Sequence, residues 1–245
     1  MILRKFDDKT GMAKAAADEA ARFIREAIAA RGHARIVVAT GSSQIEFLES
    51  LVAAPNINWG QVELFHLDEY IGLPGDHPAS FQHYIRERIL ARVPVGRAWL
   101  VDGAADPAEE CKRVGEAIAA APVDVAFAGI GENGHLAFND PPADFGTEQP
   151  FIVVDLAERG RQQQVGGGWF ASLEEVPRTA ITMSIRQILK ARAILCLVAG
   201  ARKADAVRLC LAGDIGPMAP ASALRLHQNA MVFLDREAAA LLQGA

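Results

Sequence analysis

The chain has 245 residues, of which 51% are hydrophobic and 22% charged, and this composition excludes wholesale disorder. The formal net charge of −5 excludes a general nucleic-acid-binding face, which needs a surplus of Lys and Arg. Cys111, Cys196 and Cys210 have no CxxC spacing, which predicts reduced, mostly buried thiols of a cytoplasmic protein. Residues 1–11 contain no apolar signal segment, and the longest apolar run, residues 193–201, is too short to span a membrane.

Short apolar segments alternate with segments of helical spacing along the chain. The first helix is expected to stop at Gly32, a common helix C-terminal residue. The expected helices cover residues 13–30, 45–53, 81–91, 107–120 and 201–211, with a terminal helix after the last strand. The expected strands cover residues 35–39, 62–67, 98–101, 123–128, 152–155, 180–183, 194–198 and 231–234.

This alternation predicts an α/β fold with a mostly parallel, open, Rossmann-like sheet and helices on both faces. No Pro/Ser-rich linker divides the sequence, so we expect a single domain over residues 1–245. Irregular segments at 141–150 and 165–168 predict a lid or mobile loop around residues 141–170. Ligands of such sheets bind beyond the C-terminal ends of the strands, so the polar residues that follow strands are the candidates for function.

The first candidate cluster is Thr40-Gly41-Ser42-Ser43, between an expected strand and an expected helix. Backbone N–H groups at a helix start carry partial positive charge, Gly41 allows a tight turn, and the two hydroxyls add donors. These features suit a phosphate. A plain helix N-cap is an equally good interpretation of this stretch alone.

The second cluster is the acidic pair Asp68 and Glu69, which follows an apolar strand and precedes a turn with Gly72 and Pro74. Adjacent carboxylates at a strand end can act as general bases, because burial and mutual repulsion tune their pKa values. By itself, the pair would more often be a solvated acidic turn or a helix cap.

The third cluster is the segment 129–142, which contains GxGxxG directly after a strand. A dinucleotide site would need a long helix next, but two prolines at 141 and 142 leave room for only about two turns. Asn133, His135, Asn139 and Asp140 crowd this space instead. His135 with a carboxylate five residues later predicts an oriented acid/base imidazole.

Other catalytic arrangements receive little support. His33, His77 and His83 are expected to be solvated, and no pair of residues has the spacing of a zinc site. Ser42 and Ser43 lie outside a GxSxG elbow, which argues against an α/β-hydrolase triad.

Several segments resemble the glucosamine-6-phosphate deaminase (isomerase) family. The matching segments are collinear from about residue 30 to residue 235. They are DEYIGLP at 68–74, HPASF at 77–81 and GIGENGHLAFN at 129–139, with further matches at 40–43, 198–204 and 222–227. Related 6-phosphogluconolactonases share the fold and a Gly-rich Gly-His turn, but they usually carry Arg where Tyr70 stands.

The resemblance implies isomerisation of an amino-sugar 6-phosphate with loss of ammonia, without a metal or redox cofactor. Asp68 would move a proton between C2 and C1, His135 would promote ring opening, and Asp140 would orient His135. Asn133 occupies a position where many members have Asp. The residues implied for phosphate binding are Gly41, Ser42, Ser43 and Lys203. The expected partner is therefore a small amino-sugar phosphate, bound by a monomer or small homo-oligomer.

The sequence departs from the family pattern in three places. Asp140 replaces the usual Glu, Asn133 removes one negative charge beside His135, and no Arg directly precedes Trp169-Phe170, where many members carry a phosphate-binding Arg. Arg161 or a remote Arg could take its place. The substrate could accordingly be another hexosamine phosphate, such as galactosamine 6-phosphate. The longer regulated members have additional basic residues and a longer C-terminus, so we expect no amino-sugar allostery.

Three alternatives stay open at this point. One is a sugar-phosphate lactonase on the same fold, against which Tyr70 and the segment 137–139 count. Another is a non-catalytic sugar-phosphate-binding protein, which the missing Arg makes conceivable. The weakest is a dinucleotide-dependent dehydrogenase.

Overall fold

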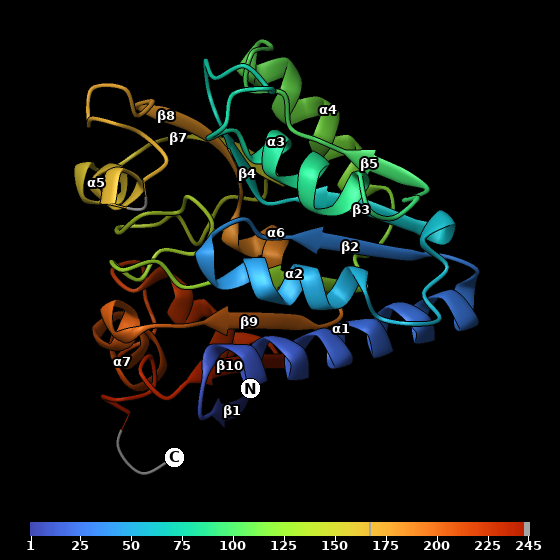
Figure 1. The fold of residues 1–245 in the computed structure, drawn as a ribbon. Helices are drawn as coiled ribbons and strands as arrows, with labels where there is room; N and C mark the ends of the chain where they lie inside the picture. Colours follow the sequence, from blue (N-terminus) through green and yellow to red (C-terminus); the bar gives the residue numbers. More distant parts are fainter. Residues whose placement is uncertain (167, 243–245) are drawn as a thin grey trace.

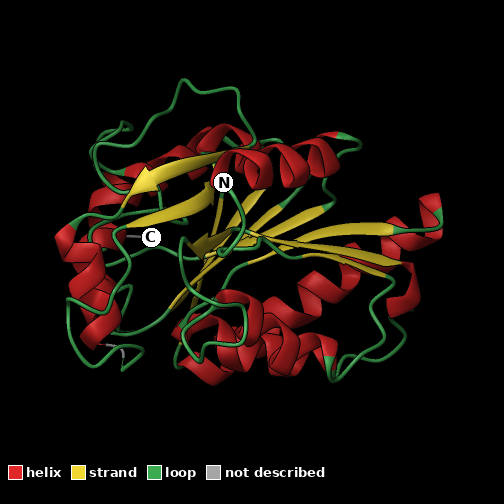
Figure 2. Cartoon of the chain, turned by 90° about the horizontal axis from the view of Figure 1, so that it is seen from above, coloured by secondary structure: helices red, strands yellow, loops and turns green. Residues whose placement is uncertain are grey.

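The computed structural model describes residues 1–166 and 168–242, and within them it forms a parallel sheet flanked by helices on both faces (Figures 1 and 2). The strands of this sheet run in the order β1-β10-β9-β6-β2-β3-β5. They are β1 (Ile2–Phe6), β2 (Ala34–Val38), β3 (Val62–His66), β5 (Arg97–Trp99), β6 (Val125–Ala128), β9 (Ile194–Val198) and β10 (Ala230–Asp235). All of their pairings are parallel, which confirms the predicted fold class.

The two faces of the sheet are covered by different helices. One face packs against α1 (Lys9–Arg31), α2 (Ile45–Val52) and α3 (Phe81–Ile85), and the other against α4 (Pro107–Ala119), α6 (Ile185–Leu189) and α7 (Ala204–Ala212). Side chains alternate between the faces along each strand. On β2, Ile36 and Val38 pack in the core beneath α1–α3, and Val37 packs in the core on the opposite face. Because both faces are buried, β9 is apolar throughout and β2 is apolar except for Arg35.

A second, smaller sheet corrects one expectation. Residues 152–155 and 180–183 are strands, as predicted, but they do not join the parallel sheet. They belong to β7 (Phe151–Asp155) and β8 (Thr179–Met183), which form a three-stranded antiparallel sheet with β4 (Asp68–Tyr70). The alternating burial along β7 fits this arrangement, because an antiparallel sheet can leave one face in water.

Helix α1 shows how local sequence sets the element boundaries. The Asp8 carboxylate accepts a hydrogen bond from Gly11 N at 2.7 Å and caps the N-terminus. Gly32 ends the helix in the left-handed conformation, with φ of 78°, as the sequence predicted. The face turned to the sheet is mostly alanine, which lets the helix approach α2 and the strands closely.

Three local expectations were wrong or incomplete. Strand β1 was not predicted, and it pairs with β10 at the edge of the sheet. The expected terminal helix is absent from residues 236–242, which form turns around the Asp235 carboxylate and its bond from Ala238 N at 2.7 Å. The segment 165–168 was expected to be irregular, yet α5 (Glu158–Gly166) extends into it, while residue 167 lies outside the described residues.

Five 3₁₀- or π-helical segments complete the described elements. They are η1 (Ser42–Gln44), η2 (Trp59–Gln61), the π-helical η3 (Arg86–Leu90), η4 (Ala201–Lys203) and η5 (Pro220–Leu226). Two of them, η1 and η4, directly follow strands β2 and β9 and carry residues from the predicted phosphate-binding set. None of the helices in the described residues is both long and apolar enough to cross a membrane.

Candidate functional site

A cavity of about 690 Å³ opens at the C-terminal ends of the parallel strands. Most of its walls come from the loops after β2, β3, β6 and β9, and the start of α3 and residues near the end of α5 complete them. The chain order reverses between β2 and β6, which are neighbours in the sheet although β3 and β5 intervene in the sequence. Loops diverge at such a switch point and leave a crevice, so the cavity lies where a ligand of this fold is expected.

The end of the cavity beside β2 and β9 presents hydroxyl groups and a lysine. Gly41 turns the chain after β2 with φ of 139°, a conformation that favours glycine, and η1 then begins with Ser42 and Ser43. Lys203 reaches the same cavity from η4, at the start of α7. Burial lowers the pKa of Lys203 to about 8, because it strips water from the charged ammonium group. These groups can bind an anion.

Asp68 enters the cavity from the junction between the two sheets. Leu67 N donates to Val38 O at 3.2 Å, and Met183 N donates to Leu67 O at 2.7 Å, so the residue before Asp68 connects β2 to β8. The side chain of Asp68 lines the cavity although the residue is only 6% exposed. Burial, and then the negative charge of Glu69, raise the pKa of Asp68 well above its usual range. Such a carboxylate is a stronger base than an exposed one.

Glu69 has a different environment from its neighbour. Its carboxylate accepts hydrogen bonds from the Ser80 hydroxyl at 2.7 Å, from Gln82 N at 2.8 Å and from Tyr70 N at 2.9 Å. It therefore fixes the start of α3 and does not line the cavity. The sequence could not say which acid of the pair is free for chemistry, and the structure places only Asp68 in the cavity.

His135 faces the cavity from the Gly-rich loop after β6. Asn133 organises this loop, because its Oδ1 accepts from His135 N at 3.1 Å and its Nδ2 donates to Asp140 Oδ1 at 2.7 Å. Asp140 Oδ1 lies 3.3 Å from His135 Nδ1, and its Oδ2 accepts from Ala157 N at 3.0 Å. Burial opposes ionisation of Asp140, but its bonds from His135 and Asn133 outweigh this and lower its pKa. The imidazole is therefore held by a carboxylate that stays charged.

The segment after the glycines is a loop and not the helix of a dinucleotide site. Ala137 adopts a φ of 53°, and the Asn139 side chain donates to Leu136 O at 2.8 Å and to Met183 O at 2.9 Å. Phe138 N donates to Thr182 Oγ1 at 3.0 Å, so β8 supports the loop from behind. The doubt about the GxGxxG motif is confirmed, because no helix begins between residues 129 and 142.

The structure thus brings most of the predicted residues to one cavity. Asp140 and Asn133 lie behind His135 and do not themselves line it. Arg161, a possible replacement for the missing arginine, donates to the carbonyl oxygens of Leu173 and Val176 and is also not part of the lining. The predicted residues that do line the cavity are Gly41, Ser42, Ser43, Asp68, His135 and Lys203.

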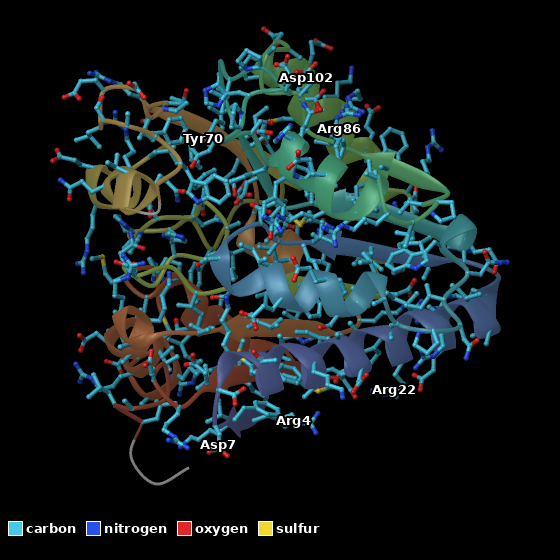
Figure 3. All side chains as sticks on the ribbon, viewed as in Figure 1. Arg4, Asp7, Arg22, Tyr70, Arg86 and Asp102 are labelled. Carbon is cyan, nitrogen blue, oxygen red and sulfur yellow. The ribbon has the colours of Figure 1, made fainter. Side chains whose placement is uncertain are left out.

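Several cavity residues were missed by the sequence analysis. Tyr84, on α3, donates to Gly41 O at 3.3 Å and supports the turn after β2. Phe81 and Phe138 stack at 5.6 Å and belong to an aromatic cluster around the buried Tyr70, which Figure 3 shows inside the molecule near the small sheet. Nothing in the sequence pattern distinguishes Tyr84 from an ordinary helix residue. Arg202 also lines the cavity, and its position next to Lys203 was a signal that could have been used.

Metal binding has no obvious site in the part of the chain that the structure describes. Nowhere in residues 1–166 and 168–242 do three His, Cys, Asp or Glu side chains come together in a way that could hold a metal ion. The cysteines are all free, with Cys196 and Cys210 buried and Cys111 half-buried, as predicted.

Comparison with known proteins fits the geometry of the cavity. The model of the family "Glucosamine-6-phosphate isomerases/6-phosphogluconolactonase" matches residues 7–233. The chain belongs to this family. Among its curated members, a glucosamine-6-phosphate deaminase of Streptococcus pneumoniae (strain 70585) is 34% identical over 215 residues, covering 87% of this chain and 89% of its own. Another from Bacillus cereus (strain G9842) is 35% identical over 225 residues, covering 91% and 84%.

Solved structures of family members have the same fold. A monomeric glucosamine-6-phosphate deaminase superposes with a TM-score of 0.91 at 33% identity, over 98% of this chain and 100% of its own. A 6-phosphogluconolactonase from Shewanella baltica superposes with a TM-score of 0.79 at 21% identity, over 96% and 97%. The second likeness shows a shared fold and does not discriminate between the two activities.

Proposed function

We propose that this protein converts glucosamine 6-phosphate, or a related hexosamine 6-phosphate, to a ketohexose 6-phosphate and ammonia. The observation that carries the proposal is that the buried Asp68, His135 and Lys203 line one cavity, with Asp140 behind His135. The names of the curated relatives and of the similar solved structure support the same reaction.

The proposed chemistry begins at the end of the cavity beside β2 and β9. Ser42, Ser43 and Lys203 bind the phosphate and fix the sugar by one end, with Gly41 providing the turn. His135 transfers a proton between the ring oxygen and the C1 hydroxyl, which opens the ring to the aldehyde. Asp140 keeps the imidazole oriented, and Asn133 holds that carboxylate in place.

Asp68 then performs the isomerisation. Its carboxylate takes the proton from C2, the C2–H electrons form a C1–C2 double bond, and the former aldehyde oxygen gains a proton. Asp68 returns a proton to C1, which moves the double bond to C2 and nitrogen and gives an iminium ion. Addition of water and expulsion of ammonia leave the ketone. A raised pKa suits this role, because the carboxylate must accept a proton from carbon and then release it.

The deciding experiment is an ammonia-release assay with glucosamine, galactosamine and mannosamine 6-phosphates. We expect turnover of at least one epimer, and a loss of kcat of about 10³-fold or more in Asp68→Asn. Asp18→Asn, on the exposed face of α1, is the matched control and is expected to keep full activity. Absence of turnover with every hexosamine 6-phosphate would reject the proposal, and hydrolysis of 6-phosphogluconolactone would identify a lactonase instead.

The cellular setting is part of the proposal. The free cysteines and the phosphorylated substrate support a cytoplasmic enzyme, and the acidic net charge supports a small-molecule partner over nucleic acid. The similar solved protein is described as monomeric, which supports the monomer among the predicted assembly states. The segment 141–170 supplies Gln164, Gly166 and Trp169 to the cavity wall, and its role as a moving lid stays a prediction.

A further inference from the structure

The charge available to a phosphate in this cavity is smaller than the ligand requires. A phosphate monoester carries a charge of about −1.5 to −2 at pH 7. Lys203 supplies at most one positive charge, and burial lowers the pKa of that ammonium to about 8. Asp68, Glu132 and Glu237 line the same cavity, and their carboxylates add negative charge. A second cation would balance the remaining charge of the dianion.

Arg202 is placed to be that cation. Among the cavity-lining residues that the structure describes, only Arg202 and Lys203 are arginine or lysine. Both belong to η4, which follows the glycine turn at Gly200, where φ is 92°. Both residues thus line the cavity from adjacent positions of one loop, and Ser42 and Ser43 of η1 line the same cavity.

The backbone of this loop is firmly held while the Arg202 side chain is not. Gly200 N donates to both oxygens of Asp235, at 2.9 and 3.1 Å, and Ala201 N donates to Glu237 at 3.2 Å. Asp235 is itself only 6% exposed. The Arg202 side chain, in contrast, is 72% exposed, and its Nε lies 3.5 Å from Glu132 Oε1. That separation is at the outer limit of a hydrogen bond, so the guanidinium can leave Glu132 at little cost.

A phosphate is a better partner for Arg202 than Glu132 is. The planar guanidinium can donate two parallel hydrogen bonds to phosphate oxygens, and the dianion carries more charge than one carboxylate. Arg161 cannot take this role without breaking its bonds to the carbonyl groups of Leu173 and Val176.

We propose that Arg202 is the second phosphate-binding cation of this site and that it exchanges Glu132 for the substrate phosphate. Arg202 thereby substitutes for the arginine that the sequence lacks before Trp169. The inference deepens the proposed function, because it assigns a residue to the phosphate end of the same cavity. It requires only that the ligand is a sugar phosphate, and not that the sugar is deaminated.

The test measures binding separately from turnover. Glucitol 6-phosphate carries the phosphate but neither a carbonyl nor an amine, so its affinity can be measured by calorimetry on the whole protein. We expect Arg202→Gln to weaken its binding by about 10- to 100-fold, as for loss of one charge-assisted pair. Arg202→Lys should recover part of the affinity. Arg208→Gln, on the exposed side of α7 and outside the cavity, should bind like the unaltered protein.

The outcomes separate this inference from the proposed function. Equal affinity in Arg202→Gln and the unaltered protein overturns the role of Arg202, whether or not hexosamine phosphates are turned over. A loss of kcat with unchanged affinity for glucitol 6-phosphate also overturns it, because Arg202 would then act through the His135 loop. Loss of affinity in a protein that turns over no hexosamine 6-phosphate upholds Arg202 and rejects the deaminase.

Discussion

The two ends of the cavity, one at His135 and the other at Lys203, differ in how many hydrogen bonds their polar side chains make within the protein. At the His135 end, each group is held by another, since Asn133 contacts both the loop backbone and Asp140, and Asp140 contacts both His135 and Ala157, the residue before α5. At the Lys203 end, the hydroxyls of Ser42 and Ser43 and the ammonium of Lys203 have no hydrogen-bond partner among the described residues. One end is organised before a ligand arrives, and the other keeps its donors for the ligand.

This difference matches the proposed division of roles, with proton transfer at the His135 end and phosphate binding at the Lys203 end. In the proposed reaction His135 moves a proton, and such a group must be positioned accurately before reaction, which the internal bonds at the His135 end would provide. A group that only attracts a dianion gains most when its donors are not already used. Changes at the His135 end should therefore lower kcat, and changes at the Lys203 end should raise KM or Kd.

In the comparison of the two ends, the largest effect is expected from Gly131→Ala at the His135 end. A Cβ at residue 131 would lie 2.2 Å from the Cε1 and Nε2 atoms of His135, so the imidazole must move. The backbone of Gly131 lies outside the left-handed region, so the conflict is with the imidazole and not with the backbone conformation of residue 131. We expect kcat for ammonia release to fall about 100-fold, as for an ångström-scale displacement of a catalytic group, with KM nearly unchanged.

Gly129→Ala is the matched control for this prediction. A Cβ at residue 129 would lie 3.5 Å from Leu197 O and 3.6 Å from Gln44 Nε2, which are ordinary contacts. The two glycines share the loop after β6, so an equal loss of kcat in both variants would mean that general loop strain, and not the position of His135, limits the reaction. Melting temperatures of the two proteins complete the comparison.

A smaller effect is expected from the titration of Lys203 at the other end. Because the pKa of this ammonium is lowered to about 8, the charged form predominates at pH 7 and is lost as the pH rises through that value. Burial is the main cause of the lowered pKa; the charge of Glu132 raises the pKa of Lys203, and the charge of Arg202 lowers it further. Only the cation attracts the phosphate, so Kd for glucitol 6-phosphate should rise about tenfold between pH 7 and pH 9. Isothermal calorimetry in matched buffers measures this Kd at each pH.

Lys203→Arg shows whether this pH dependence belongs to residue 203. An arginine stays protonated over the whole range, so its Kd profile should be nearly flat between pH 7 and pH 9. Glucitol 6-phosphate has no amine, and the second pKa of its phosphate, about 6, lies below the range. The same tenfold loss in Lys203→Arg would assign the titration to another group.

The fold was predictable where a strand is apolar throughout. Strand β9 was predicted with its observed bounds, since only a buried strand explains the run ILCLV. Strand β1 was missed because its sequence, ILRKF, is mostly exposed and is a strand only through its pairing with β10. The small sheet was missed for a similar reason, since the segment Asp68–Tyr70 has no β-branched residue and pairs with a strand more than 100 residues away.

The site was predictable where residue type and position after a strand agree. Asp68, His135 and Lys203 all reached the cavity, because the C-terminal ends of parallel strands meet at one edge. The sequence could not separate Asp68 from Glu69, since the difference depends on Ser80 and Gln82, more than ten residues away. It also could not place the pair formed by Arg202 and Glu132, which belong to different strand loops.

The smallest expected effect on catalysis comes from Arg35, which lies on β2 away from the cavity. Its guanidinium is buried, donates to Ala117 O at 2.6 Å and Ile118 O at 3.1 Å at the end of α4, and pairs with Glu63. Arg35→Met removes these bonds and leaves buried carbonyl groups without a donor. We expect the free energy of unfolding to fall by about 3–5 kcal/mol in urea titrations.

The kcat of Arg35→Met should not fall with its stability. The hydrogen bonds that hold the segments next to Asp68 and His135 do not involve Arg35. The folded fraction of Arg35→Met should therefore keep the kcat of the unaltered protein. Arg22→Met removes an exposed arginine on α1, labelled in Figure 3, and should cost only about 0–1 kcal/mol. A fall in kcat that follows stability across these two variants would mean that the His135 end depends on global packing. Loss of stability without loss of kcat would instead show that local bonds in the loop after β6 organise that end.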